Sequence, residues 1–349
     1  MLAATYYLPQ LLTSLLLAFL ALKALQPIAY DVGLVDRPGS RKNHIGNIPL
    51  IGGISIFIGV LVSSSIWLPD TQELRMYLIA SGMMVFIGIL DDKYDLSVRV
   101  RIVGQILIAS ILIFGVGTYI SNLGDLFRLG SIDIGLLGVF FTYFAILVLI
   151  NAFNMIDGID GLLGMLSLNT LLSITLLLLL SGETSDINFP LIISFAIVPY
   201  LAFNLGVSRK DRNKIYMGDA GSMFIGLSVI WLLAKGTQGE NASFSPVTAL
   251  WITALPLMDM LAIVIRRVKK GNSPFKPDRD HIHHILLRSG YTAKQTLFIL
   301  SVVAVVMSSI GIIGHIYQIH DSLMVSSFIL IFILYSRALK YVSFSVNKD

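Results

Sequence analysis

Four groups of acidic, amide, glycine and histidine residues recur along the chain, each beside a long apolar run. They are Asp-Asp-Lys-Tyr-Asp at 91–95, Asn-Ala-Phe-Asn-Met-Ile-Asp-Gly-Ile-Asp-Gly at 151–161, Tyr-Met-Gly-Asp-Ala-Gly-Ser at 216–222 and Asp-Arg-Asp-His-Ile-His-His at 278–284. Paired carboxylates are typical Mg²⁺ ligands, with substrate phosphates completing the coordination shell. Glycines let backbone approach a ligand, and helix starts favour anions. The groups therefore predict a pocket for a metal and a diphosphate.

Each group also has a plainer interpretation. The acids at 91–92 could cap a helix, the 151–161 run could be a simple turn, and the basic loop at 267–295 could contact anionic lipid. The 151–161 run lacks the spacing and the distal Glu of an EF-hand. The histidine run offers no regular fourth zinc ligand, and the absence of Cys excludes thiol catalysis and disulfides.

Asp259 stands apart because it lies inside an apolar run, in Pro-Leu-Met-Asp-Met. A carboxylate inside a membrane is costly, and such residues are usually functional or paired. Arg266 lies seven residues on, roughly 10 Å along the same helix face. We expect a structural ion pair between these two residues rather than direct catalysis by Asp259.

The composition predicts a membrane protein. The 349 residues are 55% hydrophobic and 13% charged, about half the charge of a soluble domain. The apolar residues form about eleven runs of membrane-spanning length, predicted near 6–29, 48–68, 73–90, 102–121, 134–153, 162–181, 189–207, 220–236, 247–266, 296–316 and 322–340. We expect an all-α bundle of spanning helices, because lipid leaves no other partner for backbone amides.

The Lys and Arg residues predict the orientation of the chain. All of the 25 lie in or beside one alternating set of loops except Lys23, Arg75, Arg128 and Lys235. The positive-inside rule puts that set in the cytoplasm, the N-terminus in the periplasm and the C-terminus in the cytoplasm. We expect one polytopic domain, 1–349, with its catalytic loops at about 30–47, 91–101, 154–161, 208–219 and 267–295.

Taken together and in order, the four groups resemble the polyprenyl-phosphate N-acetylhexosamine-1-phosphate transferase family. The resemblance covers nearly the whole chain, and the loop from 266 to 284 is similar to the branch that makes undecaprenyl-diphosphate-GlcNAc. The resemblance implies transfer of GlcNAc 1-phosphate from UDP-GlcNAc to undecaprenyl phosphate, with Mg²⁺ or Mn²⁺, at the cytoplasmic face of the bacterial inner membrane. It implies the first membrane step of a surface polysaccharide such as O antigen or enterobacterial common antigen.

The resemblance also implies roles for individual residues. It implies that Asn154 and Asp219 hold the metal. It implies catalytic roles for Asp91, Asp92, His281, His283 and His284. It implies substrate contacts for Asn151, Asp157, Asp160, Tyr216, Arg101, Arg266, Lys42 and His44. Relatives often have Lys where this chain has Arg101, and arginine keeps the charge but changes the geometry.

The order of bond formation is a hypothesis at this stage. The second pKa of a phosphate monoester is near 6, so the lipid phosphate is mostly a dianion at pH 7 and needs little help from a base. We therefore favour direct attack on the β-phosphorus over a covalent phosphosugar on an aspartate. The sequence leaves open another UDP-HexNAc as donor, a possible homodimer and, more distantly, a membrane transporter.

Overall fold

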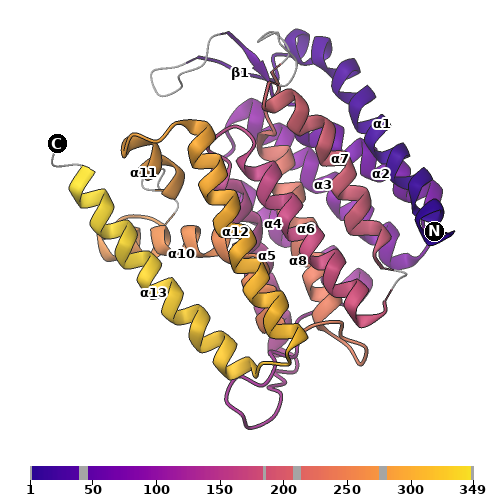
Figure 1. Ribbon diagram of the computed structural model, residues 1–349. Helices are drawn as coiled ribbons and strands as arrows, with labels where there is room; N and C mark the ends of the chain where they lie inside the picture. Colours follow the sequence, from indigo (N-terminus) through magenta and orange to yellow (C-terminus); the bar gives the residue numbers. More distant parts are fainter. Residues whose placement is uncertain (1, 39–45, 184–185, 207–213, 275–280, 347–349) are drawn as a thin grey trace. The chain divides into compact units, whose positions relative to one another are not determined.

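The computed structural model describes residues 2–38, 46–183, 186–206, 214–274 and 281–346, and these residues are mostly helical (Figure 1). They form eight helices long and apolar enough to cross a membrane, one bent helix pair that would make a ninth span, and two shorter apolar helices. These eleven segments correspond to the eleven predicted ones. The prediction of an all-α membrane protein is confirmed.

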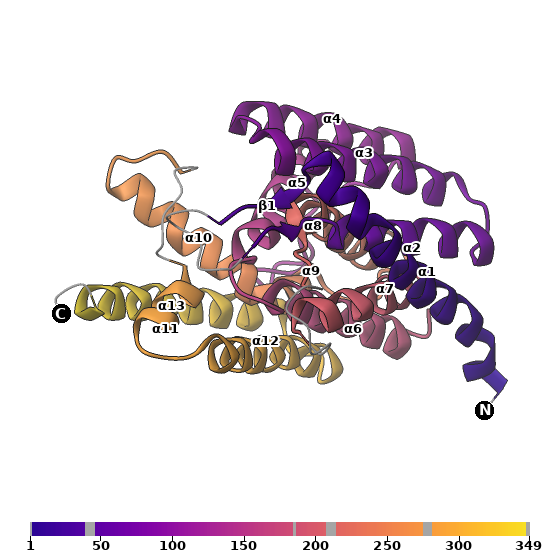
Figure 2. The same ribbon diagram turned by 90° about the horizontal axis from the view of Figure 1, so that it is seen from above.

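The chain forms two compact units, and the first comprises residues 1–118 and 183–228. It contains α1 (Leu2–Val32), α2 (Gly52–Trp67), α3 (Gln72–Tyr94), α4 (Val98–Val116), α7 (Asn188–Asn204) and the start of α8 (Gly218–Thr237). Within it α1 packs on α2 and α7, and α3 lies beside α4 (Figure 2). A two-residue hairpin, β1 (Val35–Asp36) with β2 (Ile48–Pro49), follows α1.

The second unit comprises residues 119–182 and 229–349. It contains α5 (Leu137–Ile156), α6 (Leu162–Ser181), the end of α8, α9 (Pro246–Ile252), α10 (Ala254–Lys269), α11 (Ile282–Arg288), α12 (Ala293–Ile316) and α13 (Asp321–Val346). The sequence predicted no helix at α11, because its seven residues follow a basic loop without an apolar run.

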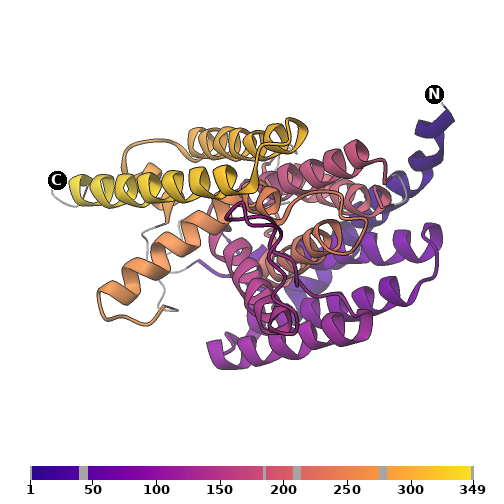
Figure 3. The same ribbon diagram turned by 90° about the horizontal axis from the view of Figure 1, so that it is seen from below.

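The predicted span at 247–266 is two helices, α9 and α10, that meet at 82°. The break has a local cause at Pro256. Proline has no N–H to donate to the carbonyl of Ile252, but it is tolerated in the first turn of a new helix. Thr253 joins the two helices with φ −102° and ψ 14° and donates its hydroxyl to the carbonyl of Ala249. Helix α10 then lies next to α13 (Figure 3).

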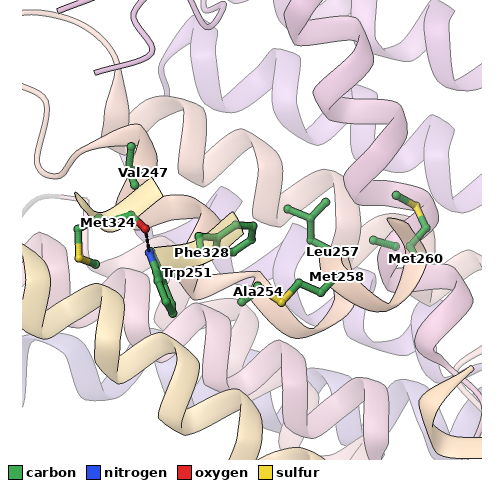
Figure 4. Close-up of a cluster of buried hydrophobic side chains, with 9 residues drawn as sticks. Val247, Trp251, Ala254, Leu257, Met258, Met260, Met324 and Phe328 are labelled. Atoms are coloured by element: carbon green, nitrogen blue, oxygen red, sulfur yellow. Dashed lines mark hydrogen bonds between the residues drawn. The ribbon is translucent and has the colours of Figure 1, made fainter. Parts of the chain in front are cut away.

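An apolar cluster fixes α13 against α9 and α10 (Figure 4). Trp251 is fully buried, donates its indole N–H to the carbonyl of Met324 at 3.2 Å, and meets the ring of Phe328 edge-on at 5.5 Å. Between helices in lipid, such contacts stabilise through van der Waals packing and hydrogen bonds. The cluster therefore holds α13 in one rotational position relative to the broken helix.

Candidate active site

In the first unit, the carboxylate of Asp92 caps the start of α8. Its Oδ1 accepts the N–H of Asp219 at 2.8 Å, and its Oδ2 accepts the N–H of Ala220 at 3.2 Å. The first amides of a helix have no partner within the helix, and a negative charge there is also favoured by the helix dipole. The cap comes from the end of α3, far away in sequence. Asp92 thus fixes the backbone that carries Asp219.

Small residues make this contact possible. A Cβ on Gly88 would collide with the backbone of Ala220, and one on Gly53 would collide with Gly221. Gly218 has φ +74°, and a Cβ there would meet the Asp92 carboxylate. The backbones of α2 and α3 therefore approach α8 at positions where only glycine fits.

The end of β2 and the start of α2 hold the segment before α8. The Tyr216 N–H donates to the carbonyl of Pro49 at 2.9 Å, and its carbonyl accepts from the N–H of Gly52 at 3.0 Å. The ammonium of Lys214 lies 5.3 Å from the centre of the Tyr216 ring. Tyr216, for which the resemblance implies a substrate contact, therefore lies two residues from Gly218 on a hydrogen-bonded backbone.

Asp91 and Arg101 form an ion pair. Arg101 Nη1 lies 2.9 Å from Asp91 Oδ2, and the Leu96 N–H donates to Oδ1 at 2.9 Å. The Asp91 side chain is 2% exposed, whereas that of Arg101 is 28% exposed. Both oxygens of Asp91 are therefore engaged, and the remaining accessible edge of the pair belongs to the guanidinium.

In the second unit, the histidine run begins at a buried carboxylate. His281 Nδ1 lies 2.7 Å from Asp259 Oδ2, and the Ile282 N–H donates to Asp259 Oδ1 at 3.0 Å. The hydroxyl of Tyr335 donates to the same Oδ1 at 2.9 Å. The direct partner of Asp259 is thus His281, which fits the supporting role expected for this acid. Helical spacing had pointed to Arg266 as the partner.

The three histidines lie in contact with one another. His281 is in an extended conformation just before α11, so its ring stacks on that of His283, with centroids 5.5 Å apart and planes 14° apart. The ring of His284 lies 4.2 Å from that of His283. Burial first, then the neighbouring His284 and His281, lowers the pKa of His283 from 6.5 to about 3. His283 is therefore neutral near pH 7.

The 151–161 run covers the end of α5 and the connection to α6, and one of its glycines meets the histidines. A Cβ on Gly158 would overlap the ring of His283. Asp157 ends α5, and Gly161 begins α6 with φ +76°. Asn151 donates within α5 to the carbonyl of Leu147, and Asn154 and Asp160 are half-buried. The run and the histidines are thus neighbours in the second unit.

Two predicted basic residues have different surroundings. Arg266 is half-buried in the last turn of α10. Next to it, Arg267 is buried and donates from Nη1 to the carbonyl of Pro274 at 2.5 Å. Arg267 thus ties Pro274 to the last turn of α10. The predicted contacts Lys42 and His44 lie outside the described residues.

Asp259 and Tyr335 are site residues that the sequence only partly revealed. Asp259 stands out in the sequence as an acid within an apolar run. Tyr335 gave no signal, because an aromatic residue within the apolar run of α13 is ordinary. Among the described residues, no three acidic or histidine side chains form a ready-made metal cluster.

The chain matches the family model described as glycosyl transferase family 4 over residues 74–237. It is 43% identical over 332 residues to the undecaprenyl-phosphate α-N-acetylglucosaminyl 1-phosphate transferase of Pasteurella multocida, covering 94% of this chain and 92% of that one. It is 42% identical to the proteins of the same name from Salmonella typhi and Escherichia coli K12, covering 90% of this chain and 85% of each.

Gly88→Ala should separate α3 from α8, because the new methyl group meets backbone that cannot rotate away. We expect a loss of about 1–3 kcal/mol of stability, the usual cost of overpacking, seen as a lower unfolding temperature in detergent. Gly82→Ala on the same helix is the matched control, since its methyl group would meet only the tip of the Phe57 ring. Equal unfolding temperatures for the two variants would contradict the close packing.

Acid should destabilise the protein through His283. An unfolded histidine takes up a proton near pH 6.5, whereas the folded one resists protonation down to about pH 3. The stability is therefore complete above pH 6.5 and is lost as the pH falls through this window, by at most about 1.4 kcal/mol per pH unit. Unfolding temperatures of the wild type should thus fall more steeply between pH 7.5 and 5 than those of His283→Gln. An unchanged slope in His283→Gln would contradict the assignment.

Proposed function

The chain belongs to glycosyl transferase family 4, and from that premise we propose that it transfers N-acetylglucosamine 1-phosphate from UDP-GlcNAc to undecaprenyl phosphate. The products are GlcNAc-diphospho-undecaprenol and UMP. The observation that carries the proposal is the identity of 42–43% to transferases of that name along at least 90% of this chain. The matched length includes all four motifs, so the proposal does not rest on a shared fragment.

The protein is a multi-pass membrane protein, and we propose the bacterial inner membrane as its location. The distribution of Lys and Arg supports a periplasmic N-terminus, a cytoplasmic C-terminus and an active site at the cytoplasmic face. A water-soluble UDP-sugar and a lipid-held phosphate can meet at such a surface. The biosynthetic use of the product, O antigen and enterobacterial common antigen included, belongs to the proposal as well.

Magnesium, or manganese in its place, is the proposed cofactor. The donor set fits a hard cation: Asp219 offers a carboxylate and Asn154 an amide oxygen, and both side chains are half-buried rather than enclosed. The carboxylate of Asp92 is already engaged by two backbone amides of α8, so Asp219 is the proposed metal ligand of the two acids. When bound, the ion supplies positive charge to the diphosphate.

The protein's own contribution is positioning and charge neutralisation, as in other phosphoryl transfers. An oxygen of the lipid phosphate forms a bond to the β-phosphorus of UDP-GlcNAc, the bond from that phosphorus to the bridging oxygen breaks, and UMP leaves with the electron pair. The acceptor is already a dianion near pH 7. Asp91 is engaged by Arg101 and Leu96, which supports an orienting role for this pair beside the acceptor phosphate.

The remaining predicted residues are assigned to the donor. Asp157, Asp160, Asn151 and Tyr216 would contact the nucleoside, and Arg266 with the three histidines would contact sugar and phosphates. Lys42 and His44 stay predictions from the resemblance. Another UDP-HexNAc remains the alternative donor. None of these contacts identifies the residues that bind the sugar hydroxyls.

Purified protein in detergent should form UMP from UDP-GlcNAc and undecaprenyl phosphate in the presence of Mg²⁺. With UDP-GalNAc as the matched donor, the rate should be at least about tenfold lower. A site that hydrogen-bonds the hydroxyls of one sugar leaves polar groups unpaired when the other sugar binds. EDTA should stop the reaction, and added Mg²⁺ should restore it. Absence of UMP with both donors would refute the proposal, whereas faster turnover of UDP-GalNAc would change the assigned sugar.

Asp219→Ala should lower kcat by at least about 100-fold, because removal of a metal ligand costs more than the 10–100-fold typical of its supporting contacts. The fold should survive, since the Asp92 cap uses the backbone N–H of Asp219 and not its side chain. Asp70→Ala is the control, because this acid is exposed and pairs only with the exposed Arg75. Near wild-type turnover by a folded Asp219→Ala protein would remove Asp219 from the metal site.

A further inference from the structure

One face of α13 is buried along most of the helix. Met324, Phe328, Tyr335 and Leu339 follow one another at intervals of four, seven and four residues, the spacing of a single helical stripe. The first two pack around Trp251, and Leu339 packs with residues of α10 and α11. Tyr335 therefore occupies the middle of a docked face, and its ring has little freedom to turn.

The hydroxyl of Tyr335 donates to a carboxylate on α10 that links α10, α11 and α13 of the second unit. Asp259, on α10, is 1% exposed. Its Oδ1 accepts both the Tyr335 hydroxyl from α13, at 2.9 Å, and the Ile282 N–H at the start of α11, at 3.0 Å. With two donors on Oδ1, the carboxylate cannot rotate freely, and Oδ2 is directed at His281 Nδ1, 2.7 Å away.

This geometry favours a proton on Nδ1 of His281. A carboxylate oxygen accepts hydrogen bonds, and Oδ2 is the group that Nδ1 faces. The other nitrogen, Nε2, has no hydrogen-bond partner among the described residues, and the side chain is buried except for a small exposed part. Nε2 is then the nitrogen left to meet a substrate.

We propose that Tyr335 and Asp259 are positioning residues that hold His281 as its Nδ1–H tautomer, with Nε2 facing the phosphate-bearing substrate. The proposal rests on the proposed transferase function and extends it to a residue of α13. It also separates two roles among the histidines: His281 presents a fixed nitrogen to the substrate, and the ring of His283 packs between His281, His284 and Gly158.

The first test replaces one hydroxyl. Tyr335→Phe keeps the ring and its packing, and we expect kcat to fall by about 10-fold with the KM values for both substrates within about twofold, the range for loss of a supporting contact. Tyr341→Phe makes the same chemical change on the same helix at a side chain that is 76% exposed, and it should match the wild type. A wild-type kcat in Tyr335→Phe would overturn the proposal, even with a lower unfolding temperature, because Tyr335 would then be only structural.

A double-mutant cycle tests whether Tyr335 acts through His281. In a His281→Gln background, the further change Tyr335→Phe should reduce kcat by less than about twofold. A full 10-fold loss in that background would show an independent effect and overturn the proposal. Asp259→Asn should lower kcat more than Tyr335→Phe does, because an amide can turn either its oxygen or its NH₂ group to His281.

The tautomer itself can be observed without turnover. In ¹⁵N-histidine-labelled protein, the signal that disappears in His281→Gln should show Nδ1–H coupling in the wild type and in Tyr341→Phe. In Asp259→Asn it should show mixed or exchanging tautomers. An Nε2–H signal for His281 in the wild type would overturn the proposal. Failure of the transfer assay with the expected Nδ1–H signal present would instead count against the proposed function alone.

Discussion

A carboxylate that is removed from water needs donors, and the motifs of this protein depend on how that need is met. Asp92 takes two backbone amides from the start of α8, Asp91 takes Arg101 and an amide, and Asp259 takes a ring nitrogen, an amide and a hydroxyl. Leaving such a group unpaired would cost several kcal/mol. Each acid therefore fixes the element that supplies its donors. These contacts in turn position the motif residues on that element.

The same contacts require backbones to come close together. Gly88 and Gly53 meet the first turn of α8 without side chains, and Gly158 meets the ring of His283. These three glycines are thus points of close approach, next to the segments that carry Asp157 and Asp219. Rigid support of this kind is what a phosphoryl-transfer site needs, since its chemistry is mostly a matter of placing charges.

The break between α9 and α10 has a related consequence. Because Pro256 ends the hydrogen-bond ladder of α9, α10 takes its own direction, with Asp259 near its start and Arg266 and Arg267 at its end. One helix therefore carries both the acid that receives the histidine run and the basic residues that begin the following loop. Trp251 lies just before the break and packs against the N-terminal half of α13. Farther along α13, Tyr335 then reaches Asp259 on α10.

The sequence by itself determined the fold class, the positions of the eleven apolar segments and the residues of the four motifs, because each of these depends on local composition and spacing. Helix propensity and hydropathy act over a few turns, and a long apolar run has few alternatives in lipid. The sequence did not predict the partners of the acids. Asp92 meets a helix start 127 residues away, and Asp259 meets His281 and Tyr335 at separations of 22 and 76 residues. Such pairings are selected by the packing of distant helices, and local spacing pointed instead to Arg266. Only the tertiary structure decided which donors hold each buried acid.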